Sequence, residues 1–172
     1  MASGAADSDD SARPDTRTRT IWVVVALLVI VGLDQLTKAW AVSALADGPQ
    51  KLFGNVRFEL ARNSGSAFSR FQGYTPILAV LAIFIAVLIA RQVRQTTDRW
   101  MLVGLVLVLG GALGNLVDRF ARSPGFLRGH VVDFVAVGWF PVFNVADSCI
   151  TVGAIILVAR TLFAPQPSRA KQ

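Results

Sequence analysis

The chain has a single cysteine, Cys149, and a single histidine, His130. One cysteine excludes an internal disulfide, and a zinc site is not expected where soft ligands are this scarce. The motifs HExxH, CxxC and GxSxG and the phosphate-binding P-loop are all absent. The chemistries that depend on those motifs therefore find no support in the sequence, and we expect neither a metal nor another cofactor.

Charged residues are also scarce, at 16% of the chain, whereas hydrophobic residues make up 53%. Soluble domains have about 25% charged and about 45–50% apolar residues. The apolar excess is gathered into four runs near the length of about 20 residues that crosses a bilayer. The sequence therefore predicts an α-helical integral membrane protein with four transmembrane helices, at about residues 21–45, 74–93, 100–120 and 141–163.

The net charge of +6 comes from basic residues that lie almost entirely between and beyond these runs. In a soluble protein this excess would favour nucleic-acid binding. At the ends of membrane spans, basic side chains instead meet anionic lipid headgroups. We expect membrane lipid as a partner and no nucleic acid.

The predicted topology places both termini in the cytoplasm. Residues 1–20 are small, polar and charged, so we expect a disordered cytoplasmic tail, and residues 164–172 form a second tail. The link at 91–99 carries three arginines, which favours the cytoplasmic side. Residues 46–73 and 121–140 are then extracytoplasmic loops.

A cleaved signal peptide is the alternative interpretation of the N-terminal segment, because Ala44-Leu45-Ala46 resembles a cleavage site. Asp34 and Lys38 lie between the apolar stretch and that site, which favours a retained span.

Short strands are predicted in the extracytoplasmic loops. Val56, Phe58 and Leu60 alternate with Arg57 and Glu59, and this period of two is typical of a strand. The stretch 131–135 is apolar and extended around Asp133. These segments predict a small extracytoplasmic β-rich cradle.

Polar side chains inside the predicted spans are the strongest functional signal, because polarity is costly in a bilayer. Asp34 and Lys38 are four residues apart on one helix face, and we interpret them as a structural ion pair. Asn115, Asp118 and Arg119 share a helix face by their spacing. They indicate either a polar cap at the headgroups or, as we prefer, the wall of a site.

Asp147 lies in the fourth apolar run with Asn144 three residues before it, and no basic residue lies within one turn. Asp133 precedes it by fourteen residues in an apolar extended stretch. Two carboxyls that face each other cannot both ionise, so one keeps its proton. Such a pair can activate water without a metal, although spacing alone does not show that the two meet.

Together these segments resemble the lipoprotein signal peptidase (signal peptidase II) family, bacterial intramembrane aspartyl peptidases. The resemblance covers residues 21–163. It rests on five blocks in the family's order: Asp34-Gln35-Leu36-Thr37-Lys38, Asn63-Ser64-Gly65-Ser66-Ala67-Phe68, Gly114-Asn115-Leu116-Val117-Asp118-Arg119, Val131-Val132-Asp133-Phe134 and Phe143-Asn144-Val145-Ala146-Asp147.

The resemblance implies an endopeptidase that removes the signal peptide of diacylglyceryl-modified prolipoproteins, cleaving before the lipidated cysteine. It implies a site near the outer leaflet of the bacterial plasma membrane and inhibition by globomycin. The chemistry itself needs only one chain. It assigns the catalytic pair to Asp133 and Asp147 and a fold-supporting role to Asp34 and Lys38. The implied substrate-binding or site-lining residues are Asn63, Gly65, Asn115, Asp118, Arg119 and Asn144.

Two other functions are compatible with parts of the pattern. A small proton- or ion-coupled carrier would use Asp34, Asp147 and Arg119 as a relay, although four spans without visible repeats are few for a transporter. A non-catalytic scaffold would use the small-residue pair Gly110 and Gly114 as a helix-packing face, but it leaves the polar residues unexplained.

Overall fold

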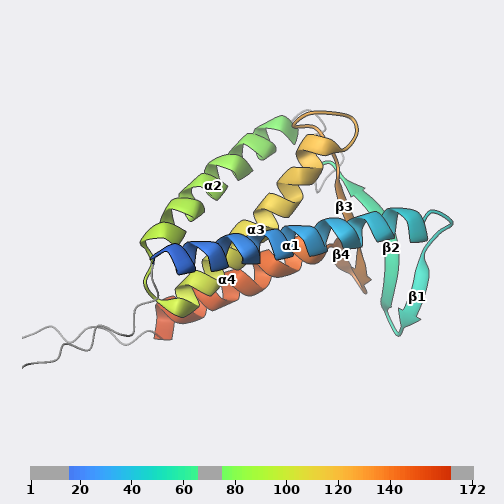
Figure 1. The fold of residues 1–172 in the computed structure, drawn as a ribbon. Coiled ribbons are helices and arrows are strands. Elements are labelled where there is room, and N and C mark those ends of the chain that lie inside the picture. The colour runs from blue at the N-terminus through green and yellow to red at the C-terminus, as the bar shows by residue number, and fades with distance from the viewer. Residues whose placement is uncertain (1–15, 66–74, 164–172) are drawn as a thin grey trace, which may run out of the picture.

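A computed structural model of the chain describes residues 16–65 and 75–163 (Figure 1). Its four helices are α1 (Thr16–Ala44), α2 (Thr75–Gln95), α3 (Arg99–Ala121) and α4 (Val145–Phe163). All four are long and apolar enough to cross a membrane. With the small antiparallel sheet described below, they confirm the predicted fold class.

The helix bounds lie within two residues of the predicted spans except at the starts of α1 and α4. α1 begins at Thr16, ahead of the predicted start at residue 21. Arg19 explains this early start, because its guanidinium donates to the carbonyls of Val93, at 2.7 Å, and Thr96 and so fixes the first turn against the end of α2. The remainder of the predicted tails, residues 1–15 and 164–172, lies outside the described residues.

α4 begins at Val145, later than the predicted start at residue 141. The intervening residues Phe140–Phe143 form a strand, β4, which pairs with the strand before it. Residues 141–143, which hydropathy assigned to the fourth membrane span, are therefore part of the sheet. This arrangement brings the sheet directly to the first turn of α4.

α3 packs against each of the other three helices and makes its most extensive contact with α4. The close approach depends on glycine. A Cβ on Gly111 would lie 2.4 Å from the backbone carbonyl oxygen of Ala146, far inside van der Waals contact. Small residues at such crossings let two helix backbones meet, which holds the start of α4 firmly against α3.

The sheet consists of β1 (Gln50–Phe53), β2 (Val56–Asn63), β3 (Val131–Val137) and β4 (Phe140–Phe143). It is antiparallel throughout, in the order β1-β2-β3-β4. The predicted alternation in β2 has a packing cause, because Phe58 and Leu60 lie against a core of Ala41, Leu45 and Phe134. The sheet is thereby fixed to the C-terminal part of α1.

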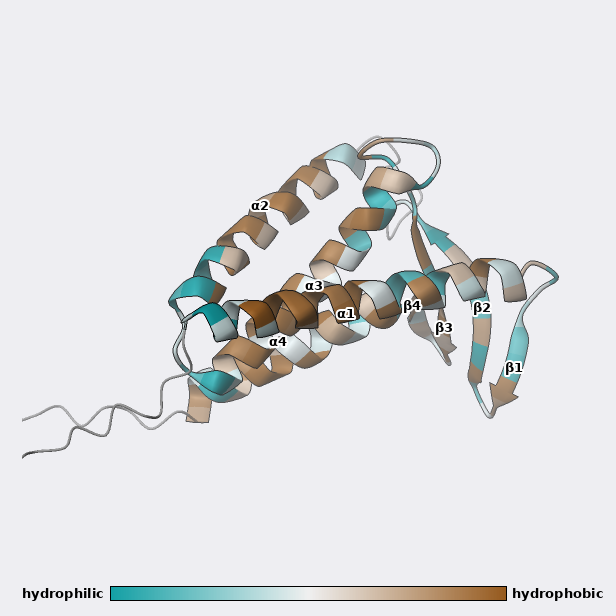
Figure 2. Cartoon of the chain, in the orientation of Figure 1, coloured by the Kyte–Doolittle hydropathy of each residue, from teal (hydrophilic) through white to brown (hydrophobic). Residues whose placement is uncertain are grey.

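Hydropathy follows this architecture (Figure 2). Brown, apolar residues run along all four helices, and teal residues gather near the helix ends and on β1 and parts of β2. Leu28 on α1 is 67% exposed and Ile155 on α4 is 62% exposed. Apolar side chains this exposed along the length of a helix are suited to lipid contact. The start of α1 and the end of α4 lie at one end of the bundle, and the sheet lies at the other (Figure 1).

Candidate active site

Asp133 is the third residue of β3 and lies opposite Ala61 of β2. Side chains alternate along a strand, so Val132 and Phe134 point to one face and are buried, while Val131 and Asp133 point to the other. That second face lines a cavity of about 310 Å³. The strand therefore places one carboxyl in the cavity wall, where Asp133 is only 2% exposed.

Asp147 enters the same cavity from the first turn of α4. Asn144 precedes the helix as its N-cap, and its Oδ1 accepts a hydrogen bond from the backbone N–H of Asp147 at 2.9 Å. In return, Oδ2 of Asp147 accepts from the backbone N–H of Asn144 at 3.2 Å. This reciprocal capping box satisfies two donors at the helix start and fixes the rotamer of Asp147.

Two amide side chains connect the carboxyls. Nδ2 of Asn144 donates to Oδ1 of Asp133 at 2.6 Å and to Oδ1 of Asn115 at 3.2 Å. Nδ2 of Asn115 donates to Oδ1 of Asp147 at 2.9 Å. Asp133 and Asp147 are thus joined by a hydrogen-bonded bridge of two amide side chains. Asn144 lies at the start of α4, and Asn115 lies in the C-terminal part of α3.

The Asp133 carboxyl is electrostatically unusual. Burial raises its pKa to about 6, and the nearby charge of Asp147 acts in the same direction. Hydrogen bonds from Asn63 and Asn144 and the charge of Lys38 lower the pKa by smaller amounts. The cavity therefore favours the protonated form of Asp133 over a wider pH range than an ordinary aspartate has.

A buried ion cluster lies behind this bridge. Nζ of Lys38 contacts Oδ2 of Asp34 and Oδ2 of Asp118, each at 2.8 Å, and all three side chains are fully buried. Arg122 pairs with Oδ1 of Asp118 at 2.6 Å, so two cations balance two carboxylates. Oδ1 of Asp34 also accepts from the N–H of Ala146 at 3.0 Å. The cluster connects α1, α3 and the start of α4.

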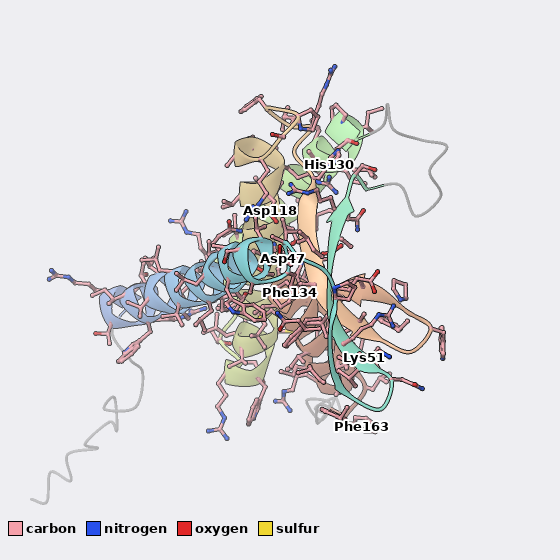
Figure 3. The ribbon with its side chains drawn as sticks, turned by 90° about the vertical axis from the view of Figure 1, so that its right-hand side faces the viewer. Asp47, Lys51, Asp118, His130, Phe134 and Phe163 are labelled. Atoms are coloured by element: carbon pink, nitrogen blue, oxygen red, sulfur yellow. The ribbon has the colours of Figure 1, made fainter. Side chains whose placement is uncertain are left out.

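Figure 3 shows how α1 takes part in this arrangement. Asp118 of α3 and Phe134 of β3 are labelled on either side of the C-terminal part of α1. Lys38 of α1 pairs with Asp118, and the ring of Trp40 of α1 meets the ring of Phe134 at a centroid distance of 6.2 Å. One helix therefore fixes both the ion cluster and the strand that carries Asp133.

Arg119 holds the loops at the rim of the cavity. Its Nη1 donates to the carbonyl of Asn63 at 3.1 Å and to that of Gly129 at 2.9 Å. Gly65 adopts φ +89 and donates its N–H to Oδ1 of Asn63 at 2.7 Å. A Cβ on Gly65 would lie 3.0 Å from the Arg119 guanidinium, so this turn requires glycine for both reasons.

The implied site residues thus occupy three places. Asn63, Asn115, Arg119, Asp133 and Asp147 line the cavity. Asn144 is fully buried in the bridge, and Gly65 lies beside Arg119. Asp118 belongs to the ion cluster, together with Asp34 and Lys38. The sequence predicted one shared helix face for Asn115, Asp118 and Arg119, but only Asn115 and Arg119 line the cavity, whereas Asp118 contacts Lys38. Neighbouring residues on a helix, such as Asp118 and Arg119, are rotated from each other by about 100°.

Sequence reasoning missed two members of the cluster. Nε2 of Gln35 donates to Asp34, Asp118 and the carbonyl of Gly114. Arg122 is four residues after Asp118, a spacing that predicts a helical ion pair and could have identified it. No comparable signal marks Gln35, whose role depends on how α1 crosses α3.

Below the polar end, the cavity is apolar. Its wall is formed along α2 and α3, by residues Leu78, Ala79, Ala82, Ile85, Ile89, Val108 and Ala112. From Leu78 to Ile89 the helix rises about 16 Å. The polar end is thus continuous with a membrane-depth apolar surface that can take an extended lipid chain or an apolar peptide segment.

In residues 16–65 and 75–163, no group of three or more His, Cys, Asp or Glu side chains is placed to hold an ion. Cys149 is a partly buried free thiol on α4.

Four spanning helices and a multi-residue polar site at their sheet-bearing end define a multi-pass membrane protein. Its fold matches the in meso structure of a bacterial membrane enzyme at 2.3 Å, with a TM-score of 0.73 and 24% identity over 88% of this chain and 94% of that one. A second structure of a bacterial membrane enzyme, at 1.9 Å, matches with a TM-score of 0.72 and 26% identity, covering 84% and 94% of the two chains.

Residues 25–163 match the family model described as Signal peptidase (SPase) II. The lipoprotein signal peptidase of Mycolicibacterium smegmatis is 50% identical over 159 residues, 91% of this chain and 67% of that protein. The lipoprotein signal peptidase of Rhodococcus jostii is 47% identical over 162 residues, 93% and 82% of the two chains. The chain therefore belongs to the signal peptidase II family of aspartic-type peptidases. Lipoprotein signal peptidase activity is the function that this membership supports.

Proposed function

We propose that Asp133 and Asp147 are the catalytic pair of an endopeptidase that removes the signal peptide from diacylglyceryl-modified prolipoproteins, cutting before the lipidated cysteine. The observation that carries the proposal is the hydrogen-bonded bridge between the two carboxyls in one cavity. The apolar wall that continues from it along α2 and α3 suits a substrate confined to the bilayer.

In this mechanism the ionised member of the pair removes a proton from water, and the resulting hydroxide attacks the scissile carbonyl. The protonated member donates a hydrogen bond to the developing oxyanion and then gives a proton to the leaving amine. Water is consumed, the peptide C–N bond breaks, and a carboxyl and an amine are formed. The raised pKa of Asp133 favours it as the proton donor, although the two groups titrate as a pair.

The surrounding residues position this chemistry. Asn115 and Asn144 orient the two carboxyls. Asn63 and Arg119 hold the rim of the cavity, where the substrate backbone would enter. Asp34, Lys38 and Asp118 support the start of α4 and the strand β3 from behind, since Oδ2 of Asp118 also accepts from the N–H of Val132. Positioning of this kind lowers the activation free energy, because the reacting groups are already held in the geometry that the reaction needs.

The test uses the full chain in detergent, a diacylglyceryl-modified prolipoprotein and the variants Asp133→Asn and Asp147→Asn. Loss of an acid or base of this kind reduces the rate by about 10²- to 10⁴-fold. Asp47→Asn is the matched control, because Asp47 is exposed in the turn after α1 (Figure 3). Signal-peptide release is read by gel shift, and the new N-terminus by mass spectrometry.

Folding of each variant is checked by its melting temperature. If a folded Asp133→Asn or Asp147→Asn variant cleaves near the parent rate, the assignment of the pair is wrong. A parallel reaction with chelator is expected to proceed unchanged. Globomycin is expected to block cleavage and to raise the melting temperature of the parent by occupying the same cavity.

We further propose that the chain resides in the bacterial plasma membrane with both termini in the cytoplasm and the site near the outer leaflet. The test replaces Cys149 by Ala and introduces Asp47→Cys or Thr97→Cys, at opposite ends of the bundle. A membrane-impermeant thiol reagent added to intact cells is expected to label position 47 alone. Labelling of position 97 alone would mean that the topology is opposite to the one proposed.

A further inference from the structure

A second, larger hollow lies at the end of the bundle that is remote from the sheet and the aspartates. It has a volume of about 980 Å³ and is formed between the first half of α1 and the first half of α3. Its apolar walls are supplied by two helices. They include Trp22, Val23 and Ala26 on α1 and Leu102, Val103 and Val106 on α3.

Arginines lie at the mouth of this hollow. Arg19 and Arg99 both line it, along with Thr16 and Thr97. Arg19 is held in place through Nη2, which donates to the carbonyls of Val93 and Thr96. The Arg99 guanidinium lies 5.7 Å from the ring centroid of Trp100, an exposed aromatic residue of the kind found at bilayer interfaces.

This end of the bundle has a large excess of positive charge. The described residues near it include six arginines, namely Arg17, Arg19, Arg91, Arg94, Arg99 and Arg160. The acidic residue described at this end, Asp98, pairs with Arg160, with 2.5 Å between Oδ2 and Nη2. That pairing and the backbone N–H of Met101 lower the pKa of Asp98 to about 2, so Asp98 is ionised and offsets one of the six arginine charges. In Figure 2 the same region is teal, in contrast to the brown helices beside it.

The length of the hollow matches one leaflet of a bilayer. It extends from Thr16 to Ile30 along α1, and this stretch of helix rises about 21 Å. One leaflet contributes half of a hydrocarbon core of about 30 Å, and the headgroup region lies beyond it. A basic mouth at headgroup depth above an apolar channel at acyl-chain depth is complementary to a single phospholipid.

We propose that the hollow between α1 and α3 is a binding site for one acidic phospholipid of the leaflet opposite the catalytic pair. An acyl chain lies along the exposed part of the apolar wall, over Trp22 and Val103, and the phosphate lies at the mouth beside Arg19 and Arg99. Charge complementarity selects an anionic headgroup over a zwitterionic one of equal chain length. The site is separate from the proposed cleavage chemistry, so its failure leaves the assignment of Asp133 and Asp147 untouched.

Native mass spectrometry of the purified full chain tests this, with phosphatidylglycerol or phosphatidylcholine of identical acyl chains titrated into the detergent solution. The parent is expected to retain one phosphatidylglycerol in preference to phosphatidylcholine. Arg99→Gln is expected to weaken phosphatidylglycerol binding about fivefold, the effect of one basic residue near a charged lipid. Arg91→Gln is the matched control, because it removes the same charge from the same end without lining the hollow.

A second variant tests the apolar part without changing any charge. Ala26→Trp fills the channel and is expected to abolish the tightly held lipid. Val103→Trp fills it from an exposed position on α3 that lies outside the helix core, and is expected to abolish the lipid while the melting temperature in detergent is kept. Arg19→Gln is less informative, because Arg19 also holds the end of α2. Cleavage by Arg99→Gln and Ala26→Trp in detergent is expected to match the parent.

Three results would overturn the proposal. Equal retention of the two phospholipids would mean ordinary annular lipid. An equal loss in Arg91→Gln and Arg99→Gln would mean a diffuse surface charge effect. A parent that carries no lipid but forms a dimer, with Ala26→Trp monomeric, would mean that a second copy of the chain covers the hollow.

Discussion

Nζ of Lys38 lies 2.9 Å from Oδ1 of Asn115, and this contact determines which way the amide of Asn115 faces. An ammonium group only donates, so the amide oxygen must point toward Lys38 and the amide nitrogen away from it. The nitrogen then meets Oδ1 of Asp147 at 2.9 Å. A fully buried cation on α1 therefore orients a carboxyl on α4 through one side chain of α3.

The first prediction concerns Asn115→Asp. This variant keeps an acceptor for Lys38 but replaces the donor that faces Asp147 by a second carboxylate oxygen. Loss of positioning at the reacting group is expected to lower kcat about 100-fold, with KM little changed. Steady-state cleavage assays measure both constants.

Asn55→Asp is the control for this variant, because Asn55 lies at the turn between β1 and β2, away from the aspartates. A folded Asn115→Asp variant with the parent's kcat would show that the contact from Asn115 to Asp147 does not position the carboxyl.

The second prediction separates the two roles of Asn144. Serine caps a helix about as well as asparagine, so Asn144→Ser is expected to keep the N-cap of α4. It loses the amide nitrogen that donates to Asp133, to Asn115 and to the carbonyl of Val132. Asn144→Ala loses both and is expected to be about 1 kcal/mol less stable than Asn144→Ser. Cleavage is expected to fall to a similar extent in the two variants.

Thermal melting in detergent and cleavage assays on the same preparations check this. Cleavage by Asn144→Ser at the rate of the parent would mean that the cap, and not the bridge to Asp133, is what the site requires.

The third prediction concerns the approach of α3 to α4. A methyl group at Gly111 would collide with the carbonyl of Ala146, next to Asp147. Gly111→Ala is therefore expected to shift the start of α4 and to cost about 1–3 kcal/mol, the usual effect of overpacking. Cleavage is expected to fall with it, because the displaced turn carries Asp147.

Gly32→Ala is the matched control, since no atom lies within 4 Å of a Cβ at Gly32 on α1. Its stability is expected to stay within about 1 kcal/mol of the parent. Equal melting temperatures for Gly111→Ala and Gly32→Ala would contradict the close packing of α3 and α4.

The fold class could be predicted from the sequence because apolar runs and alternating strands are local signals. Helix ends could not, since they depend on partners elsewhere in the chain. α1 extends back to Thr16 where Arg19 reaches the end of α2. α4 starts only at Val145 because the residues before it pair with β3.

In the site, too, single residues could be predicted from the sequence but their contacts could not. Asp147 stands out in the sequence as an unpaired charge in an apolar run, and Asp133 as a charge in an extended stretch. Their connection through Asn144 and Asn115 depends on how β3, α3 and α4 meet, which spacing does not specify. Asp118 points to Lys38 and not into the cavity because α1 crosses α3 on that side.

The last prediction follows from the pKa of Asp133, which burial raises from 3.8 to about 6. Between these values the folded protein holds a proton that the unfolded chain has released, so ionising Asp133 costs folding free energy. The stabilisation is complete below about pH 3.8 and is lost as the pH rises to about 6, a change of about 3 kcal/mol. Asp133→Asn does not titrate at this position. Across this range, the melting temperature of the parent is therefore expected to fall relative to that of Asp133→Asn.

Because the charge of Asp147 contributes to the shift, Asp147→Asn is expected to lower the pKa of Asp133 and to move this fall to lower pH. Replacing exposed Asp47 by Asn is expected to leave the pH range unchanged. A parent whose melting temperature follows that of Asp133→Asn from pH 4 to pH 6 would mean that Asp133 titrates as an ordinary aspartate.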